Sequence, residues 1–73
     1  MMSENEVKNL MKSFRVKAGY SQEKLAKVLG ISRQTLIDYE KKPGKMTIET
    51  FGKLKEIYGN DFETIFFEKK LYK

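Results

Sequence analysis

Arg33 and Gln34 stand side by side directly after Ser32, in the middle of the chain. An arginine guanidinium can donate two parallel hydrogen bonds to O6 and N7 of guanine, and a glutamine amide can form a matching pair with N6 and N7 of adenine. Each such pair discriminates between bases by about 1–3 kcal/mol. The chemistry that these two side chains offer is therefore recognition by hydrogen bonding.

Ile37 and Asp38 follow on the same polar side of the segment. We expect Ile37 to be exposed on this face, where it could contact a thymine methyl group; alternatively it could pack against the edge of the core, and single exposed apolar residues are common. Asp38 would be repelled by phosphates unless it accepts a hydrogen bond from cytosine or pairs with a nearby cation. We therefore expect Asp38 to reject some sequences rather than to attract one.

Three lysines, Lys41, Lys42 and Lys45, surround Pro43 and Gly44. Such a loop could attract phosphates in a salt-sensitive way that does not depend on sequence, or it could simply be a solvated loop. The chain has fifteen Lys and Arg against ten Asp and Glu, a net charge of +5. This excess favours a polyanionic partner, although it would also serve solubility.

Residues for other chemistries are missing from the 73-residue sequence, which contains neither histidine nor cysteine. Disulfides and histidine or cysteine ligands for a metal are therefore excluded, and the carboxylates lack the spacing of a calcium loop. No nucleophile has a histidine or cysteine partner, and no phosphate-binding loop is present, so we expect neither an enzyme nor a metal site. No apolar run approaches the roughly 20 residues of a membrane span, and we expect a cytoplasmic protein that does not contact membranes.

Helix start and stop signals divide the chain into about five short helices. The expected N-caps are Ser3, which forms a capping box with Glu6, then Ser21, Ser32, Thr47 and, for a last short turn, Asp61. Gly19, Gly30 and Gly59 end the first, second and fourth helices. The residues expected to face the core are Val7, Leu10, Met11, Phe14, Ala18, Leu25, Ala26, Val28, Leu29, Leu36, Tyr39, Ile48, Phe51, Leu54, Ile57, Tyr58, Phe62, Ile65 and Phe66.

No segment alternates with a period of two, so the fold class is predicted to be all-α. We expect one domain over residues 1–73, with a core from about 4 to 67 and an aromatic, basic tail over 68–73. Gly30, Ile31 and Ser32 form a turn of the length that joins the two helices of a helix-turn-helix unit. Ala26 is small enough to let those two helices cross closely.

From Phe14 to Tyr58 the chain resembles the Cro and phage-repressor helix-turn-helix family, the XRE-like regulators. The matching residues are Arg15, Gly19, Ser21-Gln22-Glu23, Leu25-Ala26, Gly30-Ile31-Ser32, Leu36 and Tyr39-Glu40. The resemblance implies a lambda-repressor-like bundle of about five helices with a central helix-turn-helix. It also implies that the third helix reads base edges in the major groove while the start of the second anchors a phosphate.

The resemblance assigns roles to individual positions. Arg33 and Gln34 match base-reading positions, although Arg33 could instead contact a phosphate or stay solvated. Gln22 matches a phosphate ligand, with an ordinary surface glutamine as the alternative. Ser32 and Thr35 share the start of the third helix and are expected at phosphates, although Thr35 could bond only its own helix. Lys42 and Pro43 depart from the polar residue and glycine that often follow the acidic residue in the family, which leaves the loop contacts open.

Arg15 and Glu40 match a partly buried salt bridge that ties the first helix to the end of the third. We expect this pair to be structural, with a phosphate contact by Arg15 as the less favoured alternative.

We therefore expect a sequence-specific regulator of transcription, a repressor that binds double-stranded operator DNA and needs no cofactor. The C-terminal third is rich in aromatic residues, namely Phe51, Tyr58, Phe62, Phe66, Phe67 and Tyr72. Surplus apolar surface there would suit a homodimer that reads a palindrome, with half-sites roughly 34–36 Å apart. The alternative is an antitoxin-like protein of the same fold whose main role is to bind a protein partner.

Overall fold

The computed structural model describes residues 2–72, so Met1 and Lys73 of the expected domain lie outside it. Five α-helices and one short 3-10 helix follow one another: α1 (Glu4–Lys17), α2 (Gln22–Leu29), α3 (Arg33–Lys41), η1 (Pro43–Lys45), α4 (Ile48–Tyr58) and α5 (Asn60–Glu68). Residues 2–72 contain no strand. The prediction of an all-α fold with five short helices is confirmed. None of the described helices has the length and apolar character needed to cross a membrane.

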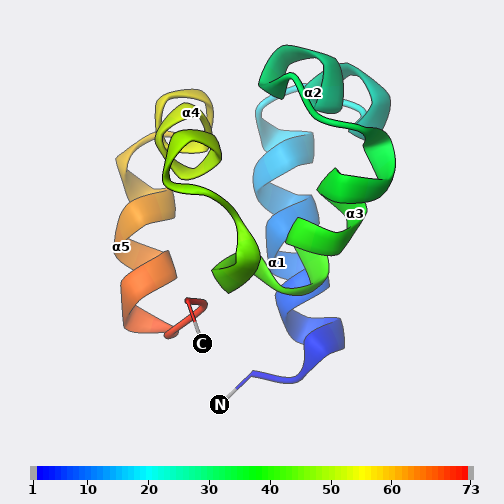
Figure 1. Cartoon of the computed structure of the whole chain (residues 1–73). Helices are drawn as coiled ribbons and strands as arrows, with labels where there is room; N and C mark the ends of the chain where they lie inside the picture. The colour runs from blue at the N-terminus through cyan, green and yellow to red at the C-terminus, as the bar shows by residue number, and fades with distance from the viewer. Residues whose placement is uncertain (1, 73) are drawn as a thin grey trace.

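The helices form two groups that face each other across the core (Figure 1). In one group, α1 and α2 both pack against α3; in the other, α4 packs against α5. The chain passes from the first group to the second through η1. The first and last described segments of the chain lie at the same end of the molecule, below α3 and α5 in the view of Figure 1.

Hydroxyl caps begin four of the helices, as predicted. The Ser3 hydroxyl accepts from the Glu6 amide at 3.2 Å and the Glu6 carboxylate accepts from the Ser3 amide at 2.9 Å, which completes the capping box. Ser21, Ser32 and Thr47 each accept from the backbone amide three residues later. Each cap stabilises its helix by about 1 kcal/mol. These contacts determine where α2 and α3 begin, and therefore which side chains stand at the start of α3.

The core is built around Phe62, which is fully buried between α1, α4 and α5. The Phe62 ring meets Phe14 and Tyr58 edge-on, with centroids 5.5 and 5.3 Å away, and Phe14 stacks on Tyr58 at 5.5 Å. Such aromatic pairs add about 0.5–1.5 kcal/mol beyond the area that they bury. The other buried apolar residues are Met11, Leu25, Ala26, Leu29, Leu36, Leu54, Phe66 and Leu71.

Two residues expected in the core face solvent instead. Val28 is 52% exposed and Ile48 is 93% exposed. The inward face of the eight-residue α2 is already filled by Leu25, Ala26 and Leu29, and Val28 falls beside that face. Ile48 is the first residue of α4, where the helix has not yet reached the core. At both positions, the spacing of apolar residues predicted burial of a side chain that is exposed.

The last helix also begins differently from the prediction. Its N-cap is Gly59 and not Asp61, and no side chain caps it. Gly59 has φ 91°, which lets the chain turn directly from α4 into α5. Asp61 lies instead in the first turn of α5, where its negative charge still complements the helix dipole.

The core extends past its expected limit at residue 67. Leu71 is only 4% exposed, and its amide donates to the Phe66 carbonyl at 2.9 Å. The turn after α5 packs closely against η1. The two segments are so near that a Cβ atom added at Gly44 would overlap the backbone carbonyl group of Tyr72. The predicted tail is therefore partly folded onto the domain and touches the loop that carries Lys42 and Lys45.

Candidate functional site

A tight turn holds α2 and α3 at a fixed crossing. Gly30 adopts a left-handed conformation with φ 71°, and the amides of Gly30 and Ile31 donate to the carbonyls of Lys27 and Ala26 at 3.1 and 3.0 Å. Ala26 in α2 is 3% exposed, and α2 packs against α3. The last carbonyls of α2 are thus satisfied before Ser32 caps α3. The side chains at the start of α3, those of Ser32, Arg33 and Gln34, are exposed.

The side chains at the start of α3 divide into exposed and half-buried sets. Arg33, Gln34 and Asp38 are exposed, whereas Thr35 and Ile37 are half-buried. The Gln34 amide nitrogen donates to the Asp38 carboxylate at 3.2 Å. Asp38 thus accepts from an amide, and none of the ion pairs among residues 2–72 includes it.

Ser32 and Thr35 form a local pair of hydroxyls. The Ser32 oxygen accepts from the Thr35 amide at 3.0 Å, and the two hydroxyl oxygens lie 2.8 Å apart. One of the two hydroxyl protons is used between them, and the other stays free to reach an acceptor. Thr35 thus bonds its own helix, which does not prevent this pair from binding an oxyanion.

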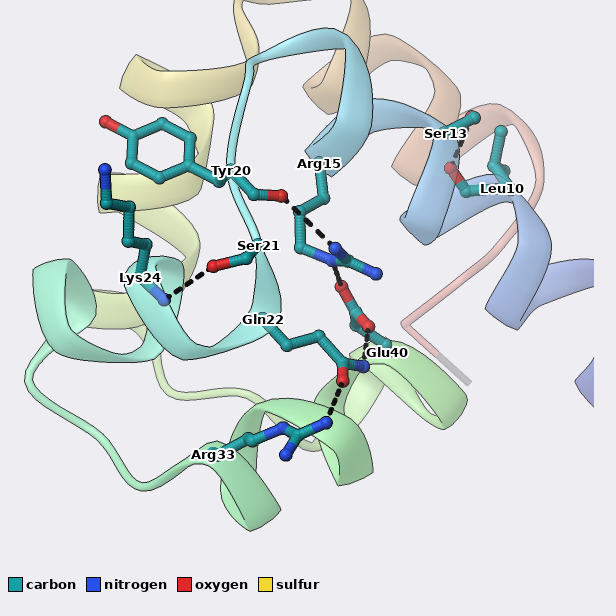
Figure 2. A network of polar contacts seen from close by, with 9 residues as sticks. All are labelled: Leu10, Ser13, Arg15, Tyr20, Ser21, Gln22, Lys24, Arg33 and Glu40. Carbon is teal, nitrogen blue, oxygen red and sulfur yellow. Dashed lines mark hydrogen bonds and ion pairs between the residues drawn. The ribbon is translucent and has the colours of Figure 1, made fainter.

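A chain of polar contacts runs from the interior to the start of α3 (Figure 2). Arg15 donates from Nε to Glu40 Oε2 at 2.8 Å, and the two side chains are 9% and 3% exposed. Arg15 also donates to the Tyr20 carbonyl at 3.2 Å. Gln22 Nε2 donates to the other Glu40 oxygen at 3.0 Å, and Arg33 donates to Gln22 Oε1 at 3.4 Å. Four residues from α1, α2 and α3 thereby meet at one corner.

The hydrogen bonds of Gln22 to Glu40 and Arg33 were not predicted from the sequence. Gln22 and Glu40 are 18 residues apart, and Gln22 and Arg33 are 11 apart, so no helical periodicity connects them. The amide nitrogen of Gln22 carries two protons, of which Glu40 takes one. The second remains available for an acceptor outside the protein.

The lysine loop lies at the other end of α3. Lys42 and Lys45 are exposed, Lys41 is half-buried, and Pro43 is buried beneath them. The three lysines, Glu4 and Asp38 line an open hollow of about 240 Å³. Basic side chains therefore stand at both ends of α3, Arg33 at its start and the three lysines at its end, with the Asp38 carboxylate between them.

Tyr58 lies near the buried ion pair without bonding to it. Its hydroxyl is buried and has no hydrogen-bond partner among residues 2–72. Burial, with a smaller contribution from the negative charge of Glu40, raises the pKa of Tyr58 above its ordinary value of 10.0. In residues 2–72 no group of three or more Asp or Glu side chains is placed to hold a metal ion.

Comparisons with known proteins agree with this geometry. A family model described as helix-turn-helix matches residues 11–65. The chain is 38% identical over 52 residues to proteins of Saccharolobus islandicus and Saccharolobus solfataricus that are named HTH-type transcriptional regulatory proteins. It is 42% identical over 48 residues to a protein of Pyrococcus abyssi with the same kind of name.

The matched parts cover 71% and 66% of this chain but only 17% and 15% of those relatives. The chain thus spans less than a fifth of the length of the curated relatives that it matches. No solved structure is a significant match.

Proposed function

The chain belongs to the Cro/phage-repressor-type, XRE-like helix-turn-helix family, and on this premise we propose that it is a sequence-specific double-stranded DNA-binding regulator of transcription. The observation that carries the proposal is the exposed pair Arg33 and Gln34 at the start of α3, beyond a short turn from α2. In helix-turn-helix proteins the second helix of such a pair lies in the major groove, where base edges can be read.

The side chains divide between base reading and phosphate binding. Arg33 and Gln34 offer donors for paired contacts to guanine and adenine, Ile37 an apolar surface for a thymine methyl group, and Asp38 an acceptor that excludes unsuitable bases. The free protons of Gln22 and of the Ser32–Thr35 pair can reach phosphates beside the groove. The lysines expected at phosphates further along α3 are Lys41, Lys42 and Lys45.

The regulator acts as a repressor, by occupying an operator that polymerase would otherwise use, and this role requires no cofactor and no catalytic step. A homodimer would read a palindrome with two copies of α3. The surface available for pairing consists of Ile48, Phe67 and Tyr72, which are 93%, 55% and 45% exposed around an open hollow of about 310 Å³. We call these three residues the C-terminal apolar patch.

A fluorescence-anisotropy titration tests the DNA-binding proposal. The chain is titrated with its own promoter region and with scrambled DNA of the same composition, at several salt concentrations. Wild type should prefer one promoter segment, and Gln34→Ala should reduce that preference by about 5- to 150-fold, because one base pair loses about 1–3 kcal/mol of discrimination. Circular dichroism checks that the variant keeps its helices.

Lys45→Ala is the matched control, because it removes a charge from the same surface without touching the start of α3. It should weaken binding to both DNAs alike and lower the salt slope of the affinity by about 0.9. Equal, weak and salt-abolished binding of wild type to both DNAs would contradict the proposal for this promoter.

The dimer is tested by sedimentation of wild type and Phe67→Glu with and without operator DNA. We expect wild type to form a two-to-one complex on a palindrome, and Phe67→Glu to bind one half-site at a time because a charge cannot be buried without a partner. A monomer whose apolar patch is protected only by a co-purified protein would favour the antitoxin-like alternative, since the same patch would then be the partner's binding site.

A further inference from the structure

Glu40 joins the buried part of the network to its surface part, because it is both the ion-pair partner of Arg15 and the acceptor for Gln22. Its side chain is 3% exposed, and it accepts from Arg15 through one oxygen and from Gln22 through the other. The bond from Arg15 at 2.8 Å and the burial of the side chain restrain Glu40 in the orientation that faces Gln22. The buried carboxylate therefore presents a fixed acceptor to the start of α2.

This fixed acceptor determines which end of the Gln22 amide faces Arg33. With Nε2 donating to Glu40, Oε1 points to the Arg33 guanidinium, as Figure 2 shows. The reversed amide would set oxygen against the Glu40 carboxylate and nitrogen against the guanidinium. Both contacts would then be repulsive, since a carboxylate only accepts and a guanidinium only donates.

We propose that Glu40 is a positioning residue for sequence recognition, which acts through the Gln22 amide to hold the Arg33 side chain in place before DNA binds. The inference rests on the proposed function and extends it to a buried residue that cannot itself reach DNA. An exposed arginine samples many side-chain conformations, and ordering it on binding lowers affinity. If Gln22 already holds Arg33 in place, less affinity is lost when Arg33 is ordered on DNA. Only operators that carry the base read by Arg33 benefit from this gain.

The expected effect is a loss of discrimination at one base pair. Ordering a long side chain in advance corresponds to about a two- to tenfold change in affinity. Glu40→Gln keeps an acceptor for Arg15, but a carboxamide allows Gln22 either orientation. Gln22→Met keeps the length of residue 22 and removes the bond to Arg33. Both variants should lower discrimination at the base pair read by Arg33 by about two- to tenfold.

The experiment measures relative affinities for a set of operators, each with one base pair changed, for wild type, Glu40→Gln, Gln22→Met and Arg33→Ala. In the Arg33→Ala background, adding either of the other changes should alter discrimination no further. A structural role of Glu40 would instead weaken all operators equally, in both backgrounds, and that result would overturn the proposal. Ile57→Ala, a half-buried change in α4, serves as a control that lowers stability without touching the network.

Side-chain amide NMR of the free protein tests the network without DNA and without a variant at Glu40. The reference for Gln22 is Asn60, an exposed amide residue in α5, because Gln34 is adjacent to the substituted residue. Arg33→Ala should shift the side-chain amide signals of Gln22 and leave those of Asn60 in place. Unchanged Gln22 signals would overturn the positioning role even if DNA binding is specific. Conversely, if the Gln22 signals shift as expected in Arg33→Ala but the protein prefers no DNA sequence, the proposed function alone is overturned.

Discussion

Removing one member of the Arg15–Glu40 pair should cost a large part of the stability of the domain. Both side chains are buried, so solvent screens their interaction little, and a buried charge left without its partner costs about 3–5 kcal/mol. A chain of 73 residues has a total unfolding free energy of about 4–11 kcal/mol, at about 0.05–0.15 kcal/mol per residue. We therefore expect Arg15→Met and Glu40→Met each to bring the domain close to unfolding.

The two losses should differ in size. Without Glu40, Arg15 still donates to the Tyr20 carbonyl, and its long side chain can bring the guanidinium toward water. Without Arg15, the more deeply buried Glu40 keeps only the Gln22 amide as a partner. Arg15→Met is therefore expected to cost more than Glu40→Met.

The double variant Arg15→Met/Glu40→Met separates the charge from the packing. It leaves no buried charge unpaired, and two methionines can fill the space, so its loss should be smaller than either single loss. Urea unfolding followed by circular dichroism at neutral pH measures all four proteins. Additive losses, or single losses below about 1 kcal/mol as for exposed pairs, would refute the argument that the pair is buried and coupled.

Two further predictions concern the packing around this pair and the C-terminal turn. Tyr58→Phe should leave stability at pH 7 unchanged or slightly higher, because the Tyr58 hydroxyl has no hydrogen-bond partner among residues 2–72. Above pH 10 the wild type should lose up to about 1.4 kcal/mol of stability per pH unit relative to the variant, since tyrosine ionises in the unfolded chain while burial raises the pKa of folded Tyr58. Urea titrations between pH 7 and 11 check this, and parallel curves would contradict it. Gly44→Ala should lower the melting temperature by displacing Tyr72, whereas Gly52→Ala, with open space around its Cβ inside α4, should raise stability by about 0.4–1 kcal/mol. Equal changes in melting temperature for the two variants would show that the C-terminal turn does not pack closely against η1.

Local chemistry accounts for the parts of the fold that the sequence predicts well. A cap needs only a hydroxyl and an amide three residues later, and a left-handed turn needs only a glycine, so Ser21, Gly30, Ser32 and Thr47 mark helix ends without knowledge of the rest. The positions of α2 and α3, and hence the exposure of Arg33 and Gln34, follow from these local signals.

The errors arise where tertiary packing decides. Val28 and Ile48 have the right spacing for burial, but the neighbouring helices leave them at the surface. Leu71 lies in a segment with no helical pattern, and it is buried because the chain turns back onto η1. Spacing in one helix cannot reveal which face a second helix will cover, nor where a terminal turn will fold.

The network at the start of α3 shows the same limit at the candidate site. The pairing of Arg15 with Glu40 could be expected from the family resemblance, but the orientation of the Gln22 amide depends on three helices that meet within a few ångströms. Once they meet, the carboxylate that stabilises the fold also sets the hydrogen-bonding polarity of the surface. Stability and base recognition are then not independent in this domain: a substitution at Glu40 changes both, whereas one at Gln34, which bonds only Asp38, should change recognition alone.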